Sequence, residues 1–205
     1  MKKLPLRIGF LASGGGSSAG AVMAAIRDGQ LDAEARLLVS NNRSAPALQL
    51  ARDFGVPALC IPTQADPDAA DAELAAAMSA HGVALIVLSG YLRRLGPRML
   101  RRWAGRILNI HPGSLPEFGG QGMYGRRVHE AVLASRATSS AIVIHVVDEE
   151  YDHGPEVARR GVEVRRDDTP ETLEARVKAL EPEFFVETLQ RIARGDLVLP
   201  GAARP

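Results

Sequence analysis

The sequence predicts a three-layer α/β/α fold, in which helices cover both faces of a doubly wound, mostly parallel sheet of about seven strands. Short apolar segments alternate with helical patterns through the first half of the chain, as in successive strand–helix–strand units. The segment 84–89 (ALIVLS) is almost entirely apolar, which is typical of a strand with helices on both faces. A chain of 205 residues suits one well-buried domain, so we expect a single domain over residues 1–205.

The first half of the chain contains most of the expected strands. These strands are predicted at residues 7–12, 35–40, 58–61, 84–89 and 106–111. The helices between them are predicted at residues 17–27, 45–54, 68–80 and 97–103. The third strand is expected to be short and buried, so Cys60 within it is expected to be a packed, inert thiol.

The pattern changes after residue 112. Residues 113–125 are rich in glycine and have few periodic apolar positions, which indicates a long loop whose conformation the sequence does not predict. The remaining elements are a helix at 127–134, strands at 140–147 and within 155–164, and a terminal helix at 171–194. Pro182 lies inside this last helix and is expected to kink or divide it.

Charge and composition argue against several classes of protein. The 25 basic and 24 acidic residues give a formal net charge of +1, so no global field favours nucleic acid or anionic lipid. No segment approaches the ~18 apolar residues of a membrane span, and the basic N-terminus lacks the features of a secretion signal. Cys60 is the only cysteine, and no cysteine–histidine cluster has metal-ligand spacing. We therefore expect a cytoplasmic protein with small-molecule ligands and no metal.

The first candidate site is the segment 13–18 (SGGGSS), between the first strand and the first helix. Consecutive glycines expose backbone N–H groups, and the start of the following helix adds unpaired N–H groups and the positive end of its dipole. Such a segment binds anions, usually phosphate. It is not an ATP-binding P-loop, because no Gly-Lys-Ser/Thr follows, and Ala19 departs from the dinucleotide fingerprint. A flexible turn with a capping serine is the alternative.

Two polar side chains end the otherwise apolar strand 106–111 (RILNIH). Asn109 and His111 lie on one face of it, because side chains repeat every two residues. Open parallel sheets bind ligands at the carboxyl ends of their strands. An amide can donate to an oxyanion, and an imidazole, with an unperturbed pKa of about 6.5, can donate or accept a proton. A single histidine is more often a hydrogen-bonded core residue, but this polar pair, followed by two prolines, favours a site.

A third candidate follows the strand 140–147. Most of the acidic side chains in residues 148–152 fit a solvated turn. Asp152 differs because it precedes His153-Gly154-Pro155, which forces a defined bend. A carboxylate at this position could orient an imidazole or relay a proton.

Together these segments resemble the folate-dependent formyltransferases, and among them the glycinamide ribonucleotide formyltransferases of purine biosynthesis. The resemblance extends from about residue 6 to residue 195 and rests on SGGGSS, LIVLSGYLRRLGPRML, RILNIHPGSLPEFGG and VVDEEYDHGP. It implies the Rossmann-like formyltransferase fold, with 10-formyltetrahydrofolate as formyl donor and the amine of glycinamide ribonucleotide as acceptor. The Asn-Ile-His-Pro run with a downstream aspartate is specific to the superfamily and less specific for the acceptor.

The resemblance also implies roles for individual residues. The family's catalytic triad matches Asn109, His111 and Asp152. The acceptor's phosphate and ribonucleotide are expected at Gly14, Gly15, Gly16, Ser17, Ser18, Lys178 and Glu181. Folate is expected at Leu92, Arg93, Arg94, Leu95, Asn109, Val147, Asp148 and Asp152. In this scheme Asn109 and a protonated His111 stabilise the negative oxygen of the tetrahedral intermediate, and Asp152 holds His111 and helps to move a proton through water.

Two departures from the family pattern concern the residues that would bind the ligands. The family's loop reads more like SGNGSN, so Gly15 and Ser18 replace two asparagines and leave mainly backbone donors for a phosphate. No arginine lies between Thr63 and Asp71 to meet the glutamate tail of folate, so Arg93 or Arg94 is the expected partner.

Three other functions are left open by these motifs. One is a formyltransferase of the same fold that acts on another amine acceptor, and a second is a formyltetrahydrofolate hydrolase. The third is a non-enzymatic nucleotide-binding module in which the polar triad is coincidental. The oligomeric state is also open, a homodimer included.

Overall fold

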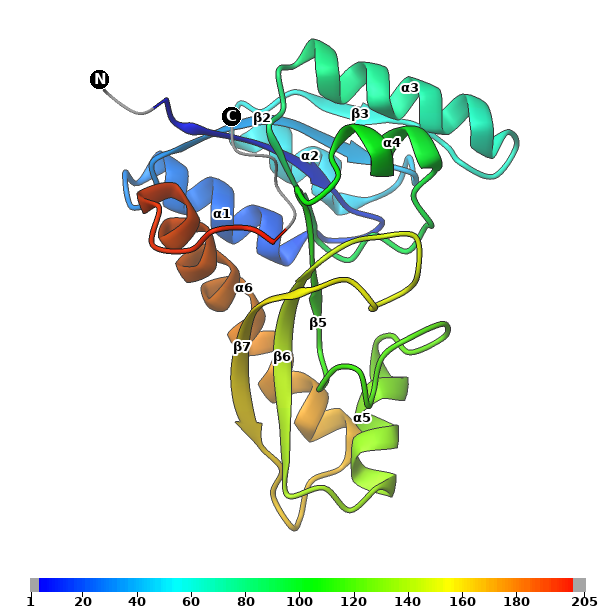
Figure 1. Ribbon diagram of the computed structural model, residues 1–205, viewed down its shortest axis with the longest axis vertical. Helices are drawn as coiled ribbons and strands as arrows, with labels where there is room; N and C mark the ends of the chain where they lie inside the picture. The colour runs from blue at the N-terminus through cyan, green and yellow to red at the C-terminus, as the bar shows by residue number, and fades with distance from the viewer. Residues whose placement is uncertain (1–3, 201–205) are drawn as a thin grey trace.

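The computed structural model describes residues 4–200, which form a seven-stranded sheet covered by helices (Figure 1). The strands are β1 (Leu6–Leu11), β2 (Ala33–Ser40), β3 (Ala58–Cys60), β4 (Leu85–Leu88), β5 (Ile107–His111), β6 (Ser139–Val146) and β7 (Glu156–Glu163). The helices are α1 (Ser17–Arg27), α2 (Pro46–Asp53), α3 (Pro67–Ala80), α4 (Pro97–Arg102), α5 (Arg126–Ala134) and α6 (Pro170–Arg194). The two ends of the expected domain, residues 1–3 and 201–205, lie outside the described residues.

The strands are arranged in the order β3-β2-β1-β4-β5-β6-β7. Strands β1 to β5 are parallel, and β6 is antiparallel to both β5 and β7. The chain winds from β1 toward one edge and from β4 toward the other, so the order reverses between β1 and β4. This arrangement confirms the predicted doubly wound, mostly parallel sheet, and ligands of such sheets bind where the order reverses.

Helices cover both faces of the sheet, and β4 shows why its sequence is apolar throughout. Its side chains at Leu85 and Val87 belong to the core beneath α1, α2, α5 and α6. Those at Ile86 and Leu88 belong to the core beneath α3 and α4. Figure 1 shows α3 and α4 together on one side of the sheet and α1 and α6 on the other. Side chains that alternate along this one strand therefore pack into two separate cores, one on each face of the sheet.

The strand β5 extends past the end of β4, and this offset makes room for a site. Only Ile107 and Leu108 of β5 pair with β4. The next residues, 109–111, pair only with β6 on the other side. Their side chains therefore lie beside the segment that leaves β4 rather than beside another strand.

The terminal helix α6 is a single helix that continues through Pro182. It begins with a capping box between Thr169 and Thr172 and ends at Gly195, whose φ of 89° suits only a residue without a side chain. The expected division at Pro182 is therefore wrong. Apolar side chains on the inner face bury the helix against the core, which keeps it continuous: Leu173, Val177, Phe184, Phe185 and Leu189.

The other predicted elements are present, and none of their ends differs from the prediction by more than two residues. The strand β3 is present but is not buried as expected, because it lies at the edge of the sheet. Its Leu59 is 40% exposed and Cys60 is only half-buried. Between residues 4 and 200, no helix combines the length and apolarity needed to cross a bilayer.

Candidate active site

The glycine loop, residues 13–18, is tied directly to the segment that follows β4. The Ser13 N–H donates to the Gly90 carbonyl over 3.1 Å, and the Leu92 N–H donates to Ser13 Oγ over 2.8 Å. The Ser13 hydroxyl in turn donates to Asn41 Oδ1 over 2.6 Å. Two predicted binding segments, the glycine loop and residues 91–95, thus lie side by side at the point where the strand order reverses.

The three glycines of the loop are not equivalent. Gly16 has φ 67°, and a Cβ there would lie 2.9 Å from Ala47 Cβ, so both backbone and packing require glycine. A Cβ at Gly14 or Gly15 would meet nothing within 4 Å. Within residues 4–200, the N–H groups of residues 15–18 donate no hydrogen bond. The loop therefore presents free backbone donors at the start of α1, as expected of an anion site.

The predicted imidazole and carboxylate lie together. His111, in β5, and Asp152, in the loop between β6 and β7, approach to 3.4 Å between Nδ1 and Oδ2. The Gly120 N–H also donates to Asp152 Oδ2, over 3.0 Å. On its other side, His111 Nε2 donates to the Phe118 carbonyl over 2.8 Å. The long glycine-rich loop thus holds both residues of the pair in place.

A second histidine, which the sequence analysis did not single out, joins this pair to Asn109. His145 lies directly opposite Asn109 in the antiparallel ladder of β5 and β6. Its Nε2 is 3.1 Å from Asn109 Nδ2 and 3.4 Å from Asp152 Oδ1. The available signal was a single polar residue in the apolar segment 141–147 (AIVIHVV). We refer to Asn109, His111, His145 and Asp152 as the histidine–aspartate cluster.

Burial sets the charge states in the histidine–aspartate cluster. Desolvation lowers the pKa of His111 below its ordinary value, although the Asp152 carboxylate opposes this. For Asp152, burial raises the pKa, but the two neighbouring histidines and the Gly120 N–H outweigh burial, so the pKa falls below its usual range. The free protein therefore favours a neutral His111 beside an ionised Asp152 near pH 7. The proton expected on His111 during the reaction stays a prediction.

The backbone at Asp152 is strained. Its φ is 57°, in the left-handed region that non-glycine residues seldom adopt. Such strain costs of order 1–3 kcal/mol and persists only where the surroundings hold the residue in place. Here Gly120 and the two histidines do so, and the strain directs the carboxylate into the cluster.

Two cavities adjoin each other near the cluster, and only the smaller one is lined by residues of the cluster. The smaller, of about 80 Å³, is lined by Asn109, His145 and Asp152, but not by His111. It also includes seven of the eight residues expected to bind folate: Arg93, Arg94, Leu95, Asn109, Val147, Asp148 and Asp152. The eighth, Leu92, lines neither cavity and is 66% exposed.

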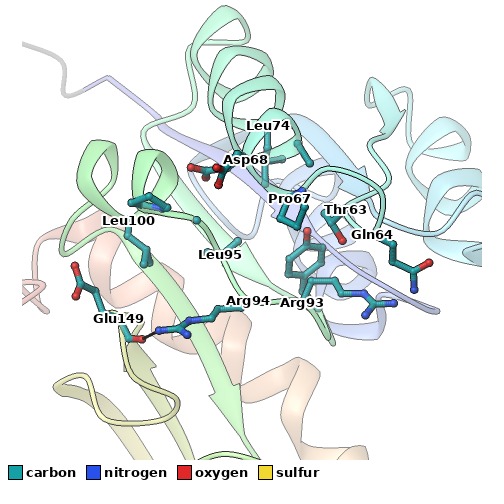
Figure 2. A pocket seen from close by; sticks show the side chains of 15 residues that line it. Thr63, Gln64, Pro67, Asp68, Leu74, Arg93, Arg94, Leu95, Leu100 and Glu149 are labelled. Carbon is teal, nitrogen blue, oxygen red and sulfur yellow. Dashed lines mark hydrogen bonds between the residues drawn. The ribbon is translucent and has the colours of Figure 1, made fainter.

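The larger cavity, of about 650 Å³, lies between the segment 91–95 and the start of α3 (Figure 2). The two cavities share Tyr91, Arg93, Arg94, Leu95 and Glu149. Arg94 donates to the Glu149 carbonyl over 2.9 Å at this boundary. In Figure 2, Arg94 extends toward Glu149, whereas Arg93 extends the other way, toward the side of Thr63 and Gln64.

Residues 6–189 match the family model described as formyl transferase. The chain belongs to this family. It is 31% identical over 188 residues to the phosphoribosylglycinamide formyltransferase of Bacillus subtilis (strain 168), and the match covers 91% of this chain and 94% of the relative. The match confirms the resemblance drawn from the motifs.

Three further proteins agree with this membership of the formyl transferase family. The chloroplastic phosphoribosylglycinamide formyltransferase of Arabidopsis thaliana is 38% identical over 190 residues, with 91% of this chain covered. This formyltransferase spans only 65% of the Arabidopsis relative and 62% of the one from Vigna unguiculata. A solved structure, glycinamide ribonucleotide transformylase 1 from Symbiobacterium toebii, superposes with a TM-score of 0.88 at 33% identity. That match covers 98% of this chain and 93% of the other.

The two acceptor-side residues expected on α6 lie close together in this formyltransferase. Lys178 is exposed, and its Nζ lies 2.6 Å from Glu174 Oε1. Glu181 is half-buried, and desolvation raises its pKa to about 7, with Glu174 adding to the shift and Lys178 opposing it. In the described part of the chain neither residue forms a hydrogen bond or ion pair with the glycine loop. Their role at the phosphate therefore stays a prediction.

Among residues 4–200, no group of three or more histidine, cysteine, aspartate or glutamate side chains is placed to hold a metal ion. In the loop after β6, Asp148 accepts from the Glu150 N–H over 2.9 Å and lies 3.1 Å from His153 Nδ1. These bonds shape the wall of the smaller cavity.

Proposed function

We propose that this formyltransferase transfers the formyl group of 10-formyltetrahydrofolate to the amine of glycinamide ribonucleotide. The products are formylglycinamide ribonucleotide and tetrahydrofolate, as in de novo purine biosynthesis. One observation carries the proposal: Asn109 and Asp152 line a cavity together with the segment 91–95, this segment is hydrogen-bonded to a loop with free backbone donors, and His111 is in contact with Asp152. The names of the bacterial and plant relatives support this choice of acceptor.

The acceptor's phosphate would bind at the free N–H groups of residues 15–18. These donors need no asparagine side chains, so the replacements Gly15 and Ser18 are compatible with the role. Lys178, on α6, would add a positive charge, and Glu181 would contact the ribonucleotide. The amine would then lie between the glycine loop and the histidine–aspartate cluster.

The folate would occupy both cavities. Sites for drug-sized ligands usually measure roughly 300–1,000 Å³, so the smaller cavity of about 80 Å³ is too small by itself. We place the pterin ring in the smaller cavity and the rest of the folate in the larger one. The hydrogen bond between Arg94 and the Glu149 carbonyl, at the boundary of the two cavities, would break when folate binds. Arg93 makes no hydrogen bond or ion pair within residues 4–200 and extends along the larger cavity, so it is free to pair with the glutamate carboxylates.

The proposed chemistry divides among three side chains. The acceptor nitrogen forms a bond to the formyl carbon, and the bond from this carbon to the folate nitrogen then breaks. Asn109 donates to the oxygen that becomes negative, and His111 exchanges the Phe118 carbonyl for the same oxygen. Asp152 receives the proton lost by the amine and passes it, through water, to the departing nitrogen. The cluster needs no large rearrangement, because Asp152 is already ionised and fixed.

The proposal treats the chain as one formyltransferase domain that acts on small molecules, without nucleic acid. The cytoplasmic location and the homodimer considered from the sequence stay predictions.

A direct test is formyl transfer by the purified chain. We expect the wild type to consume 10-formyltetrahydrofolate only when glycinamide ribonucleotide is present. Asp152→Asn should abolish turnover while both ligands still bind, and Asp167→Asn, at an exposed aspartate, is the matched control. Folate consumption at the same rate without acceptor would instead favour the hydrolase. No transfer to glycinamide ribonucleotide, with transfer to another amine, would overturn the choice of acceptor.

A further inference from the structure

We infer that His145 is a positioning residue, which fixes the side-chain amide of Asn109 so that its nitrogen donates to the formyl oxygen. The inference rests on the proposed function and adds a fourth residue to its machinery. His145 would not touch the reacting atoms, and its effect would pass entirely through Asn109.

The hydrogen bonds of His145 determine which of its nitrogens carries the proton. Its Nδ1 is 3.0 Å from the Val146 carbonyl oxygen, which can only accept a hydrogen bond. Nδ1 must therefore be the protonated nitrogen. In the neutral imidazole Nε2 then has a lone pair and no hydrogen. Because the side chain is only 2% exposed, water cannot readily take the place of either partner.

This bare nitrogen selects one orientation of the Asn109 amide. The Asn109 nitrogen, 3.1 Å away, can donate to Nε2, whereas the amide oxygen in its place would face a second lone pair. An amide nitrogen carries two hydrogens, so one bond to His145 leaves the other hydrogen for a ligand in the smaller cavity. Without His145, the amide could turn over and present its oxygen to the formyl oxygen, which would repel it.

The same geometry separates the two oxygens of Asp152. Oδ2 accepts a hydrogen bond from the Gly120 N–H, and His111 Nδ1 lies 3.4 Å from it. Oδ1 lies 3.4 Å from His145 Nε2, which has no hydrogen to donate in the neutral form. This oxygen is therefore left for the proton of the attacking amine. In its neutral form His145 therefore accepts a hydrogen bond from the Asn109 amide and donates none to Asp152 Oδ1.

Three substitutions at this position separate positioning from packing. The amide end of glutamine reaches the place of Nε2, so His145→Gln keeps an acceptor for Asn109. The shorter His145→Asn is equally polar but does not reach, and His145→Leu removes the acceptor altogether. We expect kcat to fall by about 10- to 100-fold in the Asn and Leu variants, a part of the effect of losing an oxyanion donor. The Gln variant should stay within about threefold of wild type, and KM for both substrates should change little in all three.

A double-mutant comparison shows whether the effect passes through Asn109. Once Asn109→Ala has removed the amide, adding His145→Asn should lower kcat by less than about twofold. A further tenfold loss in the double variant would overturn the inference. So would equal losses of kcat in His145→Gln and His145→Asn, because a merely structural role would not distinguish these two. A wild-type chain without formyl transfer would reject the proposed function instead.

Discussion

The histidine–aspartate cluster and the glycine loop lie near the same edge of the sheet, but they are built in opposite ways. The cluster consists of side chains, and both histidines are only 2% exposed. All four members contact one another or nearby backbone groups. The glycine loop consists of backbone donors that are unpaired within the described residues, beside two glycines that face open space.

This difference indicates which part of the site is organised before a ligand arrives. Buried polar side chains must find their partners when the chain folds, since an unpaired one costs about 1–3 kcal/mol. Backbone donors at the start of a helix can remain unpaired because water satisfies them until an anion arrives. Substitutions in the cluster should therefore change kcat. Substitutions at the loop should act through backbone conformation or through acceptor binding.

The largest expected effect is that of His111→Ala. It removes the imidazole in contact with Asp152 and should lower kcat by about 10²–10³-fold, with the KM for the acceptor nearly unchanged. Steady-state kinetics with both substrates would measure this. His81→Ala, in a histidine at the end of α3, is the control and should leave kcat unchanged. If the affinity for the acceptor fell as much as kcat did, the proposed separation of the two regions would not hold.

The next effect concerns the fold of the loop itself. Gly16→Ala forces a side chain into the left-handed region and against Ala47, and should lower the free energy of unfolding by about 1–3 kcal/mol. Gly15→Ala faces open space and should change it by less than about 0.5 kcal/mol. Urea unfolding of the two variants makes the comparison. Equal losses of stability in the two variants would contradict this comparison, because they would mean that a side chain at Gly15 is no better accommodated than one at Gly16.

A smaller effect is expected at α6. Lys178→Met removes a charge that we place near the phosphate, and should raise the KM for the ribonucleotide about tenfold while the KM for folate stays the same. Arg191→Met, at another exposed cation of the same helix, is the matched control. A parallel rise in both KM values would place Lys178 away from the phosphate.

The last effect, on stability and not on turnover, tests Glu181, an acceptor-side residue that is half-buried. Because its pKa is raised to about 7 by desolvation, the folded state binds its proton more tightly than the unfolded state does. Stability is therefore lost as the pH rises from about 4.5 through 7. Glu181→Gln should remove this loss, and raise the free energy of unfolding by about 1–3 kcal/mol at pH 8 but by much less at pH 5.

Thermal or urea unfolding at the two pH values would measure the effect of Glu181→Gln. The control is Glu183→Gln, which makes the same substitution at an exposed neighbour on the same helix and is measured at the same two pH values. A Glu181 variant with no dependence on pH would mean that this carboxyl is well solvated.

The sequence predicted the features that depend on local periodicity. The continuous apolar sequence of β4 and the polar pair of β5 are properties of single strands, so the fold, Asn109 and His111 could be found without knowing how strands pair. His145 could not, because its importance comes from lying opposite Asn109 in an antiparallel ladder. The continuity of α6 at Pro182 and the edge position of β3 likewise depend on packing between distant segments.

The unequal sizes of the two adjoining cavities have a consequence for inhibitor design. A compound anchored in the 650 Å³ cavity gains most of its contact area there, without entering the confined space beside Asn109. A short arm that displaces the Arg94–Glu149 hydrogen bond would then extend it into the 80 Å³ chamber. Fragments should therefore be bound first in the larger cavity and then extended toward the smaller one.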